Sequence, residues 1–401
     1  MGKSARLRRS QTSSPENVLL GKDSSDDPYR SDSETESNSS SGTESNMSSD
    51  STTSAGVSAM IRVFLVNFQR AKSVCSTRYS VSRQCVPERQ IALLILFPKE
   101  DNTDNSTCKL FNPDEKDKLY KMQDLGVEFA KSVCRATYGS WLLMQDSKYH
   151  LYILNIFTRK RINLPPVESQ LGMVKIERTI YDWFHFSHGH YSFSLSSPVF
   201  WIDEESKDYI VMWGLGVYCV VYAKKGDTSW NQIPQTSYFY DMVYKDHKLY
   251  FLSSTGTFQI LDFSEEMDNK TSKVVCLLDR KLVVTVTGKA LKVAKMWRPT
   301  YRTWSFRVFK ISSSGYEKLD SLGDEALLLD LGITVLASDV EGFKRNSIYF
   351  SCRPSGGYET NASDLFLFNL ETQKMELLHK FDCSSLQLYR SRWFLPSLTH
   401  T

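Results

Sequence analysis

Residues 151–160, Leu-Tyr-Ile-Leu-Asn-Ile-Phe-Thr-Arg-Lys, are repeated at residues 365–374, Leu-Phe-Leu-Phe-Asn-Leu-Glu-Thr-Gln-Lys. The two stretches share the asparagine, the threonine and the final lysine, and most of their apolar positions coincide. A weaker copy combines residues 248–252 with residues 258–263. Each copy has the pattern of a strand, an Asx residue and a bend. An internal repeat of this kind is typical of a β-propeller, whose blades are copies of one unit.

The spacing of the repeat predicts the size of this propeller. The two strong copies are 214 residues apart, close to five units of the roughly 40 to 50 residues that one blade needs. Residues 137–395 hold many short runs of β-branched and aromatic residues separated by turn clusters. We therefore expect a mainly β chain with a propeller of about six blades in this range. A β-sandwich with a chance similarity is the alternative.

The first 57 residues differ from the rest of the 401-residue chain. They contain 17 serines and one aromatic residue, with 6 basic and 9 acidic side chains. Such a segment cannot bury enough apolar surface to offset the entropy of ordering it, so residues 1–57 are predicted to be disordered. The alternation of serine with Asp and Glu between Ser24 and Asp50 suits phosphorylation by acidophilic kinases, and a solvated spacer is the alternative.

Cysteine usage and hydropathy point to the nucleus or the cytoplasm. The eight cysteines include no Cys-x-x-Cys pair, and neither a secretory signal nor an apolar run of about 20 residues is present. The cysteines are therefore expected to be reduced and mostly buried. A net charge of +3 gives no bulk attraction to nucleic acid or to membranes.

The strand-rich region contains a motif formed by residues 139–144, Gly-Ser-Trp-Leu-Leu-Met, together with residues 151–155 and 164–166. This motif resembles the opening blade of the plant F-box-associated family with a KIB-type β-propeller. Residues 241–250, Asp-Met-Val-Tyr-Lys-Asp-His-Lys-Leu-Tyr, resemble a middle blade, and residues 321–327 and 346–350 resemble late blades. The resemblance covers about residues 60–395 and implies the same propeller.

Members of this family usually carry an F-box, a three-helix module that docks on a Skp-type adaptor. Residues 67–75, Asn-Phe-Gln-Arg-Ala-Lys-Ser-Val-Cys, resemble its second half, and apolar residues at three- and four-residue steps predict a helix there. The Leu-Pro opening is absent, and Arg78 replaces the usual Trp. Residues 58–90 are thus expected to be a degenerate α-helical F-box. By resemblance, the adaptor-binding residues would be Phe64, Phe68, Ala71, Val74 and Cys75.

The remaining segments are expected to support the propeller. Residues 91–136 are predicted to connect the F-box remnant to the propeller and to pack on it, and residues 396–401 to form a short tail. The family resemblance implies that the propeller binds a protein substrate for a cullin-type ubiquitin ligase. The alternative is an interaction protein that keeps the propeller but has lost adaptor binding.

The sequence gives weak signals for other functions. His185, His188 and His190 could bind zinc, but no nearby cysteine completes a ligand set, so no metal or other cofactor is expected. The basic aromatic residues 295–310 could bind single-stranded RNA, but their alternation favours a half-buried strand. Because no nucleophile motif or phosphate-binding loop occurs, the chain is not expected to be an enzyme.

Overall fold

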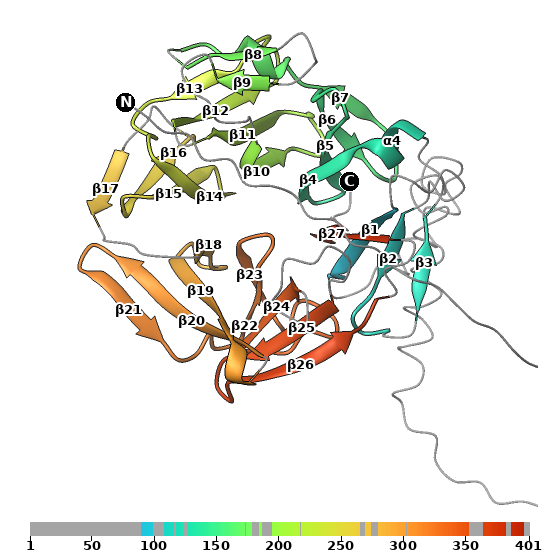
Figure 1. Cartoon of the computed structure of the whole chain (residues 1–401), viewed down its shortest axis with the longest axis vertical. Coiled ribbons are helices and arrows are strands. Elements are labelled where there is room, and N and C mark those ends of the chain that lie inside the picture. The colour runs from blue at the N-terminus through green and yellow to red at the C-terminus, as the bar shows by residue number, and fades with distance from the viewer. Residues whose placement is uncertain are drawn as a thin grey trace, which may run out of the picture. The chain divides into compact units, whose positions relative to one another are not determined.

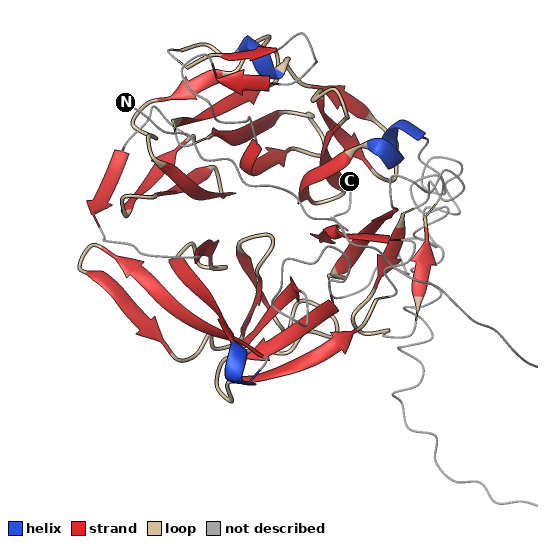
Figure 2. Cartoon of the chain, in the orientation of Figure 1, coloured by secondary structure: helices blue, strands red, loops and turns tan. Residues whose placement is uncertain are grey.

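The computed structural model describes residues 90–98, 108–115, 118–122, 127–172, 174–178, 184–186, 195–216, 218–264, 269–273, 280–301, 303–352, 364–381 and 386–396. Within these ranges most of the regular structure is β-strand (Figure 2). The helices there are short, namely α4 (Val127–Lys131), η1 (Val167–Ser169) and η2 (Pro299–Tyr301). The tail expected at residues 1–57 and, except for Gln90, the F-box remnant expected at residues 58–90 lie outside the described residues.

The strands form a ring of blades around a centre (Figure 1). Four sheets have four strands each, and a nine-stranded sheet contains two further blades, so the described strands make six blades. Blade 1 contains β27 (Leu386–Phe394), β1 (Leu93–Pro98), β2 (Lys109–Phe111) and β3 (Leu119–Lys121). Blade 2 contains β4 (Val133–Tyr138), β5 (Trp141–Gln145), β6 (Leu151–Asn155) and β7 (Arg161–Asn163).

Blades 3 and 4 follow the same plan of four consecutive antiparallel strands. Blade 3 contains β10 (Leu195–Ile202), β11 (Tyr209–Leu215), β12 (Cys219–Lys224) and β13 (Asn231–Ile233). Blade 4 contains β14 (Phe239–Lys245), β15 (Lys248–Ser253), β16 (Thr257–Asp262) and β17 (Asn269–Lys273). A small pair, β8 (Ile176–Arg178) and β9 (Phe184–Phe186), precedes blade 3. The sequence between blades 2 and 3 therefore has structure of its own.

The nine-stranded sheet joins blades 5 and 6. Blade 5 contains β18 (Arg280–Val284), β19 (Ala290–Arg298), β20 (Thr303–Ser312) and β21 (Gly315–Leu319). Blade 6 contains β24 (Ser347–Cys352), β25 (Asp364–Asn369) and β26 (Lys374–His379). Between them lies the hairpin of β22 (Glu325–Leu328) and β23 (Ile333–Leu336), which pairs in parallel with β24 on one side and with β18 on the other. The tip of this hairpin therefore lies between two blades.

The two ends of the described chain close the ring. Strand β27 pairs antiparallel with β1, with Leu94 opposite Trp393, so blade 1 takes strands from both ends. The inner strand β4 lies beside β27 and β10, and β14 lies beside β10 and β18. Closure of this kind leaves only short protected strand edges. Residues 91–136 are therefore not a connecting segment: they hold three strands of blade 1, helix α4 and most of β4.

The repeated sequence occupies the same place in two blades. Strands β6 and β25 both lie next to the outermost strand of their blades, β7 and β26, and Asn155 and Asn369 are their last residues. Asn155 Oδ1 accepts a hydrogen bond from the Thr158 amide at 2.8 Å, and Asn369 Oδ1 accepts one from the Thr372 amide at 2.8 Å. The predicted strand, Asx residue and bend are confirmed. The offset of the repeat spans four blades, not five units, because each blade with its connections is longer than we assumed.

Large aromatic side chains fill the space between blades. Trp141, Trp213 and Trp230 are fully buried in one cluster shared by blades 2 and 3. The Trp230 indole lies 5.4 Å from that of Trp213, and its Nε1 donates to the Pro165 carbonyl oxygen at 3.0 Å. On the other side, Trp393 of β27 packs against Tyr349 of blade 6. Each such ring removes on the order of 150–250 Å² from water, which stabilises the blade-to-blade contacts.

Candidate functional site

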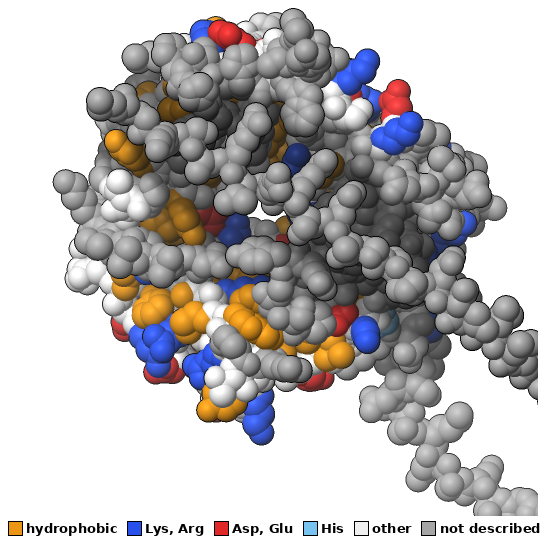
Figure 3. All heavy atoms as spheres, in the orientation of Figure 1, with side chains coloured by type: hydrophobic (Ala, Val, Ile, Leu, Met, Phe, Trp, Pro, Cys, Tyr) orange, Lys and Arg blue, Asp and Glu red, His pale blue; other side chains and the backbone are white. Residues whose placement is uncertain are grey.

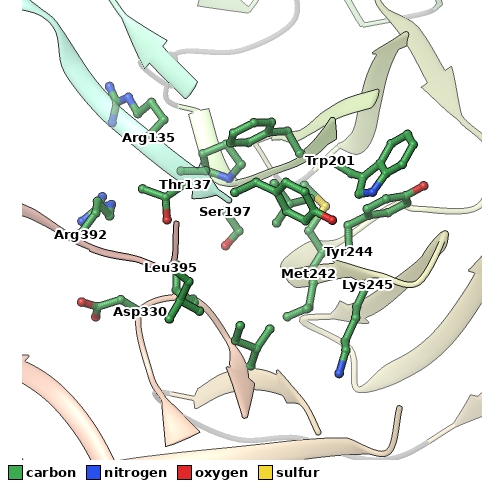
Figure 4. Close-up of a pocket in the computed structure, with 18 of the residues that line it drawn as sticks. Arg135, Thr137, Ser197, Trp201, Met242, Tyr244, Lys245, Asp330, Arg392 and Leu395 are labelled. Atoms are coloured by element: carbon green, nitrogen blue, oxygen red, sulfur yellow. The ribbon is translucent and has the colours of Figure 1, made fainter. Parts of the chain in front are cut away.

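A cavity of about 980 Å³ lies at the centre of the ring. It is lined by the inner strands β4, β10, β14, β18 and β27 and by the tip of the β22–β23 hairpin. In Figure 3, side chains of both charge signs appear beside the hollow at the centre. Figure 4 shows Arg135, Arg392 and Asp330 on one side of the cavity and Trp201, Tyr244 and Lys245 on the other. A cavity of this size lies within the range that accommodates small ligands.

Four ring side chains form an aromatic rim of the cavity: Tyr138, Trp201, Tyr244 and His247. They come from the last residues of β4, β10 and β14 and from the turn after β14. Trp201 lies 4.8 Å from His247, measured between ring centroids, in an edge-to-face arrangement. Tyr138 is 38% exposed, so part of the rim faces solvent. Exposed aromatic rings beside a cavity are a common means of anchoring a partner.

Burial and nearby charges raise the pKa values of the rim tyrosines Tyr138 and Tyr244. Burial, followed by the negative charge of Asp246, raises the pKa of Tyr138, while a hydrogen bond with Trp201 acts in the opposite direction. Burial raises the pKa of Tyr244 to about 12. Both phenols therefore stay neutral at physiological pH and can donate hydrogen bonds to a partner.

The turn beside the rim has an unusual backbone. Asp246 and His247 form the two-residue connection between β14 and β15, with Lys245 opposite Lys248. Their φ angles are 51° and 58°. Two positive φ values are those of a type I′ hairpin turn, where Asn-Gly is the preferred pair. Here the turn carries an exposed carboxylate and an exposed imidazole instead.

A buried carboxylate, that of Asp241, links three blades next to Ser197 and Lys281, which line the cavity. Asp241 of β14 is only 3% exposed. Its Oδ1 accepts hydrogen bonds from Ser197 Oγ at 2.8 Å and from Lys281 Nζ at 3.0 Å, and its Oδ2 accepts one from the Leu282 amide at 2.8 Å. These donors come from β10 and β18. Both oxygens of Asp241 thus accept hydrogen bonds from blades 3 and 5.

Asp330, which lines the cavity, has a different environment. Oδ2 of Asp330, at the tip of the β22–β23 hairpin, is buried and has no hydrogen-bond partner among the described residues. Burial raises the pKa of Asp330, and the positive charges of Arg392, Lys295 and Lys281 oppose this shift. Lys245 Nζ donates instead to the carbonyl oxygens of Thr285 at 2.6 Å and Val286 at 3.1 Å. Desolvation lowers the pKa of Lys245.

The geometry and the sequence together identify the family. A family model described as the KIB1-4 beta-propeller matches residues 110–374. The chain belongs to this family. The matched residues 110–374 cover most of the sequence that forms the ring. The two strands that close the ring, β1 and β27, lie before and after this range in the sequence. The resemblance to the plant KIB-type propeller is confirmed.

Arabidopsis thaliana has several close relatives within the KIB1-4 family. Probable F-box protein At4g22165 is 99% identical over 340 residues, which cover 85% of this chain and 94% of the relative. Putative F-box protein At4g22180 is 57% identical over 369 residues, covering 84% and 90%. Putative F-box protein At4g22660 is 54% identical over 378 residues, covering 85% and 94%. These names agree with the F-box resemblance of residues 67–75.

Most of the site residues predicted from the sequence lie outside the part of this KIB1-4 propeller that the structure describes. Phe64, Phe68, Ala71, Val74 and Cys75 lie outside the described residues, as do His188 and His190. The described ranges contain no group of three His, Cys, Asp or Glu side chains placed to hold a metal ion. They also contain no helix long and apolar enough to cross a membrane. Cys108, Cys134 and Cys219 are buried thiols, as expected.

The basic aromatic stretch forms strands, as its alternation predicts. Residues 290–298 and 303–312 are β19 and β20, paired with Trp297 opposite Trp304. Phe306 and Val308 are buried and Arg307 is exposed.

The cavity residues were not identified from the sequence. Asp241 opens a motif that resembles a middle blade, but nothing in that motif shows which residues it contacts.

Proposed function

We propose that this protein is the substrate-recognition subunit of an SCF-type, cullin-based ubiquitin ligase. The observation that carries the proposal is a closed six-blade propeller in a family whose Arabidopsis relatives named above are called F-box proteins. A rigid ring with a central cavity and an exposed aromatic rim is suited to binding. The ligase chemistry would belong to other subunits, so this chain would act in the nucleus or cytoplasm by binding and not by catalysis.

Residues 58–90 would dock on a Skp-type adaptor. Phe64, Phe68, Ala71, Val74 and Cys75 would supply the apolar contacts, since they recur at helical spacing. Arg78 replaces an aromatic residue that would bury on the order of 150–250 Å², so we expect weaker adaptor binding than that of an intact F-box.

The adaptor contact is tested with purified proteins. The full chain and the Phe68→Ala and Val74→Ala variants are titrated with a plant Skp-type protein, and a relative with an intact F-box serves as the positive control. We expect micromolar binding that both substitutions weaken. Absence of binding by the full chain, with the control intact, would remove the ligase role. The alternative, a propeller that binds its partner without an adaptor, would then remain, as Arg78 and the missing Leu-Pro opening suggest.

The aromatic rim would bind the protein substrate. We expect a Tyr138→Ala/Trp201→Ala variant to lose a partner that the wild-type chain binds. The matched control is Tyr301→Ala, because Tyr301 is 73% exposed and lies in η2, after the end of β19 that points away from the rim. A genuine substrate should also become more abundant in plants that lack this protein, because the ligase would no longer mark it for degradation. A partner that binds the rim variant as well as the wild type would exclude the rim as the recognition surface.

A further inference from the structure

The backbone around Asp330 is fixed by hydrogen bonds, although one oxygen of its carboxylate, Oδ2, has no hydrogen-bond partner. It lies at the tip of the β22–β23 hairpin, between Leu329 and Gly332. The Leu329 amide donates to the Tyr349 carbonyl oxygen at 3.1 Å, and the Val284 amide donates to the Gly332 carbonyl oxygen at 2.8 Å. Gly332 has a φ of 68°, and a Cβ there would lie 2.9 Å from the Leu282 carbonyl oxygen. Backbone contacts on both sides therefore fix the tip.

The unpaired oxygen of Asp330 calls for a donor that the described protein does not supply. Its Oδ2 atom is buried and unpartnered. A buried acceptor without a donor is costly, so native proteins usually satisfy it with protein, water or ligand. Nothing in the backbone anchoring of the tip requires a carboxylate at this position. The carboxylate is thus available to a molecule inside the cavity.

The wall around Asp330 carries an excess of positive charge. Five Lys and Arg side chains line the cavity, against two Asp side chains, Asp246 and Asp330. Arg392, Lys295 and Lys281 are close enough to Asp330 to act on its ionisation. Asp241 is satisfied by Lys281 and two further donors, and within the described ranges Arg392 forms no ion pair with a carboxylate. The wall therefore favours an anion that also brings a hydrogen-bond donor.

Phosphate meets both requirements, whereas sulfate meets only one. We propose that this wall binds a phosphate group that carries a proton, with Arg392, Lys295 and Lys281 facing its oxygens and Asp330 Oδ2 accepting a hydrogen bond from its P–OH. Sulfate has the same shape but no proton near neutral pH, so it would meet the Asp330 carboxylate as a like charge. The cavity of about 980 Å³ leaves room for a small organic group on the phosphate. This site is independent of the ligase role.

Calorimetric titration of the full chain tests the proposal. Sodium phosphate, sodium sulfate and glycerol phosphate are compared at neutral pH and equal ionic strength. We expect phosphate to bind roughly 10- to 100-fold more tightly than sulfate, the difference that one charge-assisted hydrogen bond provides. Glycerol phosphate, whose second pKa is about 6, has mostly lost its P–OH at neutral pH, so we expect it to bind more weakly than inorganic phosphate, and tighter binding would overturn the role of the P–OH. Equal affinity for phosphate and sulfate, or no phosphate binding, would overturn the proposal.

Three variants separate the parts of the site. Asp330→Asn should abolish the preference for phosphate, because an amide can donate to sulfate. Arg392→Gln should weaken both anions by roughly tenfold and leave the preference intact. Asp320→Asn is the matched control, since that side chain is 82% exposed, and it should change neither affinity. A folded Asp330→Asn variant that still prefers phosphate would refute the role of Asp330. If that variant does not fold, Arg392→Gln and the wild-type selectivity remain decisive.

Discussion

Replacing Asp241 by alanine should destabilise the ring at the junction of blades 3, 4 and 5. The substitution removes the acceptor of three donors: the Ser197 hydroxyl, the Lys281 ammonium and the Leu282 amide. The Leu282 side chain is fully buried, and an unsatisfied buried amide costs about 1–3 kcal/mol. Removing one partner of a buried ion pair costs about 3–5 kcal/mol. Because the Lys281 side chain is 32% exposed, cavity water can hydrate it and reduce that cost. We expect a total loss of about 2–4 kcal/mol.

Equilibrium unfolding in urea measures this loss. The free energy of unfolding of Asp241→Ala is compared with that of wild type and of Asp320→Ala, an exposed site where we expect a change within about 0.5 kcal/mol. A double-mutant cycle with Lys281→Met isolates the Asp241–Lys281 pair from the other two contacts. If Asp241→Ala stays within about 0.5 kcal/mol of wild type, the buried carboxylate does not join the blades as the geometry indicates.

Two substitutions and one alkylation experiment test the packing between and within blades. Trp230→Phe leaves the Pro165 carbonyl oxygen without its donor and should cost about 1–3 kcal/mol in the same urea experiment; an unchanged midpoint would contradict this. Gly214→Ala places a Cβ 2.3 Å from the Phe239 ring and should lower the melting temperature, at a cost of about 1–3 kcal/mol or more, whereas a neutral effect would show that the ring moves freely. Burial raises the pKa of Cys219 to about 12, so this thiol should resist alkylation at neutral pH in the folded protein and react in urea.

The sequence predicted the propeller because its repeat depends on local chemistry. A strand followed by an Asx bend is specified within ten residues, and the bends at Asn155 and Asn369 have the expected side-chain hydrogen bonds. The start of the ring was harder to predict. Residues 93–97 are all buried, so they show no alternation, and β2 and β3 have only three residues each. Their place in blade 1 depends on pairing with β27, close to the other end of the chain, which no local pattern reveals.

The candidate site could not be predicted for a related reason. Asp241 meets its partners Ser197 and Lys281 at separations of 44 and 40 residues along the chain. Asp330 faces cations from β18, β19 and β27. These side chains converge only because inner strands of successive blades surround one cavity. Nothing in a single strand distinguishes a lysine that lines the cavity from one that faces solvent.

The carboxylates of Asp241 and Asp330 therefore have different physical explanations. Asp241 is accounted for by structure, because three donors from neighbouring blades satisfy it. Asp330 is not, because one of its oxygens is buried without a donor while Leu329 and Leu331 on either side are apolar. A buried charge is seldom the most stable choice when an apolar residue fits. Asp330 forms a hydrogen bond with Ser351, but its buried Oδ2 has no donor, and a ligand inside the cavity would supply one. Stability should accordingly depend on Asp241, and anion selectivity on Asp330.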